Sequence, residues 1–125
     1  MSVAILREGD YLIAAILSDL TDKEVLELRG ELTELVGRYR SRGLVIDVSA
    51  LDVIDSFVAR ALRAVAITAR LRGAETIIVG IRPDVAIAMV QFNLNMEPLR
   101  CALDLDEAFQ RLAELTRHRG GSDGR

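Results

Sequence analysis

The chain has 125 residues, of which 50% are hydrophobic and 28% are charged, and its formal net charge is −3. This length and balance are typical of one globular domain with its own core, and they argue against a disordered chain. The acidic balance disfavours a nucleic-acid partner, because such partners favour a surplus of basic side chains gathered on one face.

The N-terminal stretch does not have the form of a targeting signal. It has no basic leader and is interrupted by Arg7, Glu8 and Asp10. No uncharged stretch reaches the roughly 20 apolar residues of a membrane span. The single cysteine, Cys101, cannot form an internal disulfide, which fits a reducing compartment. We therefore expect a cytoplasmic protein with no membrane partner.

The N-terminal third predicts a hairpin followed by an amphipathic helix. Apolar, β-compatible runs at 3–6 and 11–17 are separated by a Gly-Asp turn, as in two adjacent strands. Thr21 and Glu24 have the spacing of a capping box, so a helix is expected to begin there. Gly43 is the expected C-terminal stop of that helix.

The rest of the chain alternates strands with helices. The apolar runs that predict strands lie at 44–48, 75–79 and 100–103. The expected helices lie at 56–72, at 83–92 and from a second capping-box pattern at 104 onward. The last of them is expected to turn Leu105, Ala108, Leu112 and Leu115 inward. This order predicts an α/β fold with a mixed central sheet of about five strands and about four helices. We expect one domain over residues 1–117 and a disordered tail at 118–125.

Side chains that could catalyse a reaction are few. The only histidine, His118, lies in the expected tail, which argues against Ser-His-Asp and Cys-His arrangements. One His and one Cys are too few for a zinc site, and neither GxGxxG nor GxxxxGK[ST] occurs. Cys101 is expected to pack as a small hydrophobe. We therefore expect no enzymatic activity and no cofactor.

Three aspartates are candidates for a magnesium site. Asp47, Asp52 and Asp55 surround a predicted strand-to-helix connection, and Asp47 resembles the phosphoacceptor of response-regulator receivers. Such receivers also use a lysine from a later strand end, whereas the only lysine, Lys23, falls in the first helix. We favour the interpretation that these carboxylates solvate a loop and cap the next helix.

The segment 44–62 resembles the strand, loop and helix of STAS domains, the family named for sulfate transporters and anti-sigma factor antagonists. The family pattern is an apolar strand ending in Asp, a loop with a second Asp, and an apolar-Asp-Ser sequence opening a helix. Here these parts are Val45-Ile46-Asp47, Asp52 and Ile54-Asp55-Ser56. The resemblance extends over nearly the whole chain, because the order of the elements also matches, and it implies the STAS fold.

Within that family, three short motifs are similar to bacterial stressosome scaffold proteins of the RsbS type. They are Ile54-Asp55-Ser56-Phe57, Gly80-Ile81-Arg82-Pro83 and Ala102-Leu103-Asp104-Leu105. Many anti-sigma factor antagonists have Asp-Ser-Ser-Gly where this chain has Asp55-Ser56-Phe57-Val58. This departure favours the scaffold subgroup over a free antagonist.

The resemblance implies that Ser56 is phosphorylated by a switch kinase of the histidine-kinase-like ATPase fold. It implies that Asp52, Asp55 and Phe57 join Ser56 in the surface that binds this kinase. STAS-containing sensor paralogues are the other implied partners, in a homo- or hetero-oligomer. From the residues alone, the favoured interpretation of Ser56 is a plain capping serine with no signalling role, and the family resemblance reverses this preference.

One face of the helix expected at 56–72 is a candidate interface. Arg60 and Arg63 lie on this face together with Ile67, and an apolar residue rimmed by arginines suits a protein interface. The alternative is a single exposed Ile on a charged face.

The predicted function is a scaffold that sequesters the kinase until Ser56 is phosphorylated. A free antagonist that binds an anti-sigma kinase directly is the alternative.

Overall fold

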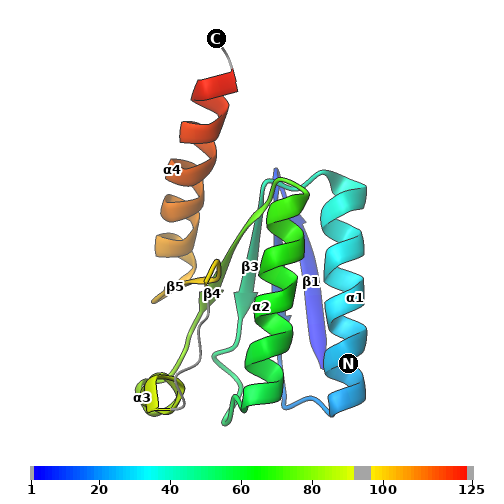
Figure 1. Cartoon of the computed structure of the whole chain (residues 1–125), viewed down its shortest axis with the longest axis vertical. Helices are drawn as coiled ribbons and strands as arrows, with labels where there is room; N and C mark the ends of the chain where they lie inside the picture. Colours follow the sequence, from blue (N-terminus) through cyan, green and yellow to red (C-terminus); the bar gives the residue numbers. More distant parts are fainter. Residues whose placement is uncertain (1, 92–96, 124–125) are drawn as a thin grey trace.

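The computed structural model describes residues 2–91 and 97–123, and its centre is a five-stranded mixed sheet in the order β1-β2-β3-β4-β5 (Figure 1). The strands are β1 (Val3–Glu8), β2 (Tyr11–Ile16), β3 (Gly43–Asp47), β4 (Glu75–Val79) and β5 (Arg100–Ala102). The helices are α1 (Asp22–Tyr39), α2 (Ser56–Leu71), α3 (Pro83–Gln91) and α4 (Leu105–Asp123). β1 and β2 are antiparallel, and every later pair is parallel. The predicted fold class is confirmed.

Helices cover both faces of the sheet. α1 and α2 lie side by side on one face, and α4 packs on the other (Figure 1). Leu44 and Ile46 of β3 point into the core under α1 and α2, whereas Val45 between them packs with Leu112 of α4. Because successive side chains of a strand face opposite sides, a strand covered on both faces reads as an unbroken apolar run. This is the pattern that predicted β3.

The start of α1 follows the sequence closely, and its end does not. Thr21 and Glu24 form the predicted capping box: the Thr21 N–H donates to Glu24 Oε1 at 2.9 Å and the Glu24 N–H donates to Thr21 Oγ1 at 3.2 Å. The helix ends at Tyr39, and Arg40 takes the left-handed conformation that terminates it. Gly43 is therefore not the helix stop. It begins β3, where an added Cβ would come within 2.8 Å of Leu112.

Two details of the C-terminal elements differ from the sequence prediction, and a third lies outside the described residues. The end expected for α3, Phe92, lies outside the described residues. Leu105, expected to point inward, is 37% exposed, while Ala108 and Leu112 are buried as predicted. α4 continues to Asp123 and so includes most of the segment expected to be a tail. The domain division at residue 117 stays a prediction.

Candidate functional site at the start of α2

The connection between β3 and α2 is held by apolar anchors. The Val48 N–H donates to the Val79 carbonyl at 2.9 Å, which ties the loop to the end of β4. Leu51 and Ile54 are buried in the core beneath α1 and α2. Between them, Val53 is 66% exposed. The loop therefore presents its polar residues and one apolar side chain on a backbone that the core keeps in place.

Asp55 begins α2, and Ser56 is the first residue of the helix. Asp55 has extended backbone angles, and its Oδ1 accepts a hydrogen bond from the Val58 N–H at 2.9 Å. The helix cap predicted for the aspartates is therefore confirmed at Asp55, and the interpretation of Ser56 as the capping serine is wrong. Ser56 therefore does not supply the side-chain cap of α2.

The Ser56 side chain is exposed and makes no hydrogen bond within the parts of the chain that the structure describes. The first amide groups of any helix have no intrahelical acceptor. Val58 satisfies its amide through Asp55, which leaves those of Ser56 and Phe57 without a partner among the described residues. The Ser56 hydroxyl thus lies beside open backbone donors at the positive end of a helix dipole.

Asp52 forms an ion pair with Arg82, a residue that no sequence pattern had assigned to the site. Arg82 Nη1 lies 3.2 Å from Asp52 Oδ1, and the side chains of both residues are largely exposed, at 45% and 74%. Arg82 follows β4, so the parallel strands bring the two loops together at their carboxyl ends. The Gly80-Ile81-Arg82-Pro83 motif contained this residue, but its spacing alone gave no indication of a partner.

Gly80 allows these two loops to approach each other. Its φ is +87°, in the left-handed backbone region that residues other than glycine rarely adopt. An added Cβ would lie 2.6 Å from the Cβ of Ser49 and 2.9 Å from its Cα. The loop after β4 therefore packs directly on the backbone of the loop that leads to Ser56.

The three candidate magnesium ligands each have a different partner. Asp47 Oδ1 accepts from the N–H and the hydroxyl of Ser49, at 2.9 and 2.7 Å. Asp52 pairs with Arg82, and Asp55 caps α2. Over residues 2–91 and 97–123, no group of three or more His, Cys, Asp or Glu side chains could hold a metal ion.

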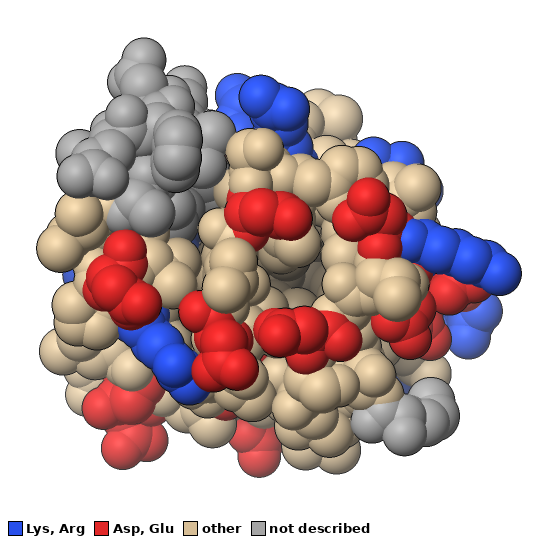
Figure 2. All heavy atoms as spheres, turned by 90° about the horizontal axis from the view of Figure 1, so that it is seen from below, with Lys and Arg blue, Asp and Glu red and all other residues tan. Residues whose placement is uncertain are grey.

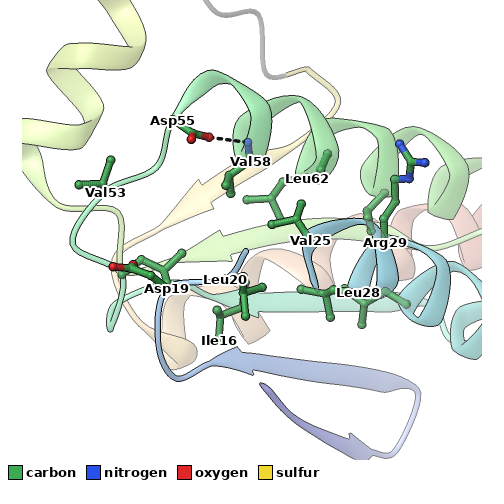
Figure 3. Close-up of a pocket in the computed structure, with 14 residues that line it drawn as sticks. Ile16, Asp19, Leu20, Val25, Leu28, Arg29, Val53, Asp55, Val58 and Leu62 are labelled. Atoms are coloured by element: carbon green, nitrogen blue, oxygen red, sulfur yellow. Dashed lines mark hydrogen bonds between the residues drawn. The ribbon is translucent and has the colours of Figure 1, made fainter. Parts of the chain in front are cut away.

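A cleft of about 220 Å³ opens beside the start of α2, between α1 and α2 (Figure 3). Its walls are mainly apolar, including Val25 and Leu28 of α1 and Leu62 of α2. Asp55 lines it from the cap of α2, and Asp19 lines it from the loop before α1. No sequence pattern indicated this cleft, because its walls come from segments far apart along the chain.

Acidic side chains gather at this end of the molecule. Figure 2 shows carboxylates around a hollow on the end where α1 and α2 begin. Asp19, Asp52 and Asp55 are all exposed. Helix N-termini stabilise such carboxylates, because the helix dipole is positive there.

The outer face of α2 carries the predicted interface residues. Arg60 is exposed and Ile67 is 38% exposed, while Arg63 donates from Nε to the Glu97 carbonyl at 2.8 Å. Leu71 at the end of the same helix is 83% exposed, which the sequence analysis did not predict. The interface role of this face stays a prediction, and its exposure is consistent with that role.

Cys101 is exposed on β5, so the prediction that it packs as a small hydrophobe is wrong. Partial desolvation raises the pKa of its thiol above the ordinary value, and the Arg111 cation partly offsets that rise. The thiolate is therefore disfavoured at neutral pH, and an activated nucleophile is not indicated.

Within the described residues, no helix is long and apolar enough to cross a membrane.

Comparison with known proteins identifies the family. A model of the STAS domain matches residues 3–108. The chain belongs to the STAS-domain family. It is 35% identical to a serine-to-glutamate variant of RsbS from Moorella thermoacetica, with a TM-score of 0.80 over 94% of this chain and 99% of that one.

Two further matches are a solved structure and a curated relative. A solved structure described as the molecular architecture of the stressosome, a signal integration and transduction hub, is 33% identical, with a TM-score of 0.72 over 91% of this chain and 99% of that one. The RsbT co-antagonist protein RsbRA of Bacillus subtilis (strain 168) is 28% identical over 81 residues. That match covers 65% of this chain and 30% of RsbRA.

Proposed function

We propose that this STAS domain is a non-enzymatic scaffold that sequesters a switch kinase of the histidine-kinase-like ATPase fold within a stressosome-type assembly. Phosphorylation of Ser56 releases the kinase. The observation that carries the proposal is the exposed Ser56 hydroxyl, which makes no hydrogen bond among the described residues and follows directly after the cap residue Asp55. The similarity to RsbS and to the stressosome structure supports the scaffold role.

A phosphate on Ser56 is compatible with the folded domain. The amides of Ser56 and Phe57 can donate to phosphate oxygens, and the dipole of α2 favours negative charge at this end. The modification adds about −1.5 to −2 charges next to Asp55 and near Asp52. The domain can therefore remain folded while its surface changes strongly in charge.

The same charge weakens the binding of a partner that covers Ser56. Val53 is exposed and Phe57 half-buried beside the serine, and the cleft between α1 and α2 opens next to them. A kinase that fits against these apolar groups excludes water from the serine. Burying a phosphate there would require desolvating a dianion beside carboxylates, which is strongly unfavourable without a matching cation. Asp52, Asp55, Ser56 and Phe57 make up the proposed kinase-binding surface.

The second part of the proposal concerns assembly. The domain co-assembles with sensor paralogues that carry their own STAS domains, and Arg60, Arg63 and Ile67 contribute to these contacts. The exposure of Ile67 on the same helix face as Arg60 and Arg63 supports this assignment.

The test is the affinity of the purified partner kinase for the unmodified protein, the Ser56-phosphorylated protein, Ser56→Ala and Ser56→Asp. Ser56→Ala should bind as tightly as the unmodified protein, and the phosphorylated protein should bind much more weakly. Ser56→Asp should release the kinase only in part, because aspartate has one charge and lacks a third oxygen. Ser18→Ala, at another exposed serine, is the matched control.

Equal affinity of the phosphorylated and unmodified proteins for the kinase would refute release by phosphorylation. Mapping of the phosphate to Ser49 or Thr68 would refute the assignment of the site. Capture of STAS-containing sensors together with the kinase supports the scaffold. Capture of an anti-sigma kinase without sensors supports the free antagonist instead.

A further inference from the structure

A groove with one acidic wall lies between the edge strand β1 and helix α1. Its volume is about 360 Å³. Its lining includes Val3 and Ile5 of β1 and Leu28, Glu24, Glu27 and Glu31 of α1. Glu24 is engaged by the N-terminal cap of α1, but Glu27 and Glu31 make no ion pair within the described residues. Like charges four residues apart on a helix repel each other, so these two carboxylates favour a cationic partner.

The complementary surface lies on α2. This helix contains no acidic residue, whereas α1 contains five acidic and three basic residues. Arg60 is exposed and has no ion pair among the described residues, and Arg63 donates from Nε to the Glu97 carbonyl. Ile67 completes a row at steps of three and four residues. We call Arg60, Arg63 and Ile67 the basic row.

The groove and the basic row match in spacing as well as in charge. Glu24, Glu27 and Glu31 also follow steps of three and four residues. With a rise of 1.5 Å per residue, each row extends over about 10 Å along its helix. A helix lying along α1 can therefore place two guanidinium groups against the carboxylates while an apolar side chain reaches the floor of the groove.

We propose that the basic row of one copy of this chain docks into the β1–α1 groove of the next copy. Arg60 and Arg63 face Glu27 and Glu31, and Ile67 packs on Val3 and Ile5. The two surfaces are different, so the contact is head-to-tail, and each added copy presents the same pair of open surfaces again. This inference rests on the assembly part of the proposed function and supplies its contact, and it can be tested without the kinase.

The experiment is a reciprocal charge reversal followed by sedimentation velocity of the purified full chain. One variant carries Glu27→Arg and Glu31→Arg, and the other carries Arg60→Glu and Arg63→Glu. Each variant alone should self-associate at least about tenfold more weakly than the wild type, the scale expected for losing close charge pairs. An equimolar mixture should regain association, because each variant retains one intact surface that fits the partner's.

Salt and a distant charge change serve as controls. Wild-type association should weaken between about 0.01 M and about 1 M salt, where the Debye length falls from about 30 Å to about 3 Å. Gln110→Arg with Glu114→Arg changes the charge on the exposed side of α4 and should leave association unchanged. Because Arg63 also bonds to Glu97, Arg60→Glu alone provides a second basic-row variant, and circular dichroism checks that each variant is folded.

A wild type that is monomeric at every concentration and at low salt would overturn the proposal. So would a mixture of two folded variants that stays dissociated, or variants that associate as strongly as the wild type. Association that requires a sensor paralogue would assign the groove to that paralogue and overturn the second copy as occupant. None of these results would change the kinase affinities, so the failure of this contact is distinguishable from failure of the Ser56 mechanism.

Discussion

Replacing Asp55 by alanine tests the local structure on which the Ser56 proposal depends. The change removes the only side-chain cap that the structure describes at the start of α2, the 2.9 Å hydrogen bond from the Val58 N–H to Asp55 Oδ1. Loss of an aspartate cap costs about 1 kcal/mol, within a range of about 0.5–2 kcal/mol. For a domain of this length, 1 kcal/mol lowers the melting temperature by roughly 3–5 °C.

Two neighbouring substitutions separate capping from charge. Asp55→Asn retains a capping oxygen and loses only the interaction of the charge with the helix dipole, so it should cost about 0.3–1 kcal/mol and less than Asp55→Ala. Ser56→Ala should change stability by less than about 0.5 kcal/mol, because an exposed hydroxyl that makes no hydrogen bond contributes little.

The assay is urea denaturation followed by circular dichroism, with the midpoint read at an unchanged m-value. If Ser56→Ala lost about 1 kcal/mol while Asp55→Ala lost nothing, the serine would be the true cap. Its hydroxyl would then have a structural role, and the argument that it is free for modification would fail. If Asp55→Asn lost as much as Asp55→Ala, the cap itself would not account for the effect.

Three further predictions follow from other described residues. Gly80→Ala should destabilise the folded domain by about 1–3 kcal/mol, because the new side chain meets a positive φ and a clash with Ser49. Gly30→Ala, in open space on α1, is the control and should be neutral or stabilising, so equal effects of the two variants in denaturation would contradict the argument. Thr76→Val should stabilise by about 1 kcal/mol in the same assay, because the buried Thr76 hydroxyl has no hydrogen bond among the described residues, and a loss of stability would count against it. Cys101 should react with iodoacetamide more slowly at pH 7 than a free thiol, because its raised pKa leaves less thiolate at neutral pH. The reaction rate should increase as the pH rises, and a rate at pH 7 equal to that of a free thiol would contradict the direction of the pKa shift.

Patterns that depend on local periodicity were predicted well from the sequence. β4 has the predicted bounds, Glu75–Val79, because all five of its residues are buried and the run is bounded by turn residues. The start of α1 was predicted by the Thr21–Glu24 capping box, which acts within a single helical turn. Local rules of this kind determine element type and order, and the order in turn predicted the mixed sheet.

Features that depend on tertiary contacts were not predicted. Gly43 reads as a helix stop, but it is needed because Leu112 and Tyr11 pack against its backbone. The ion pair of Asp52 with Arg82 exists because two loops meet at the carboxyl ends of β3 and β4. The choice between Asp55 and Ser56 as the cap depends on a shift of one residue, which hydrophobic patterning does not resolve.

Helix α2 carries both the proposed kinase site and the proposed assembly surface. Ser56 and Arg60 are four residues apart, which places their side chains on the same side of the helix, one turn apart. A phosphate on Ser56 would attract the Arg60 guanidinium, because pairs of opposite charge at this spacing interact favourably. That pairing would compete with the proposed contact of Arg60 to Glu27 and Glu31 of the next copy. Phosphorylation therefore acts on the two proposed interactions in the same direction: it repels the kinase at the helix start and withdraws a cation from the head-to-tail contact.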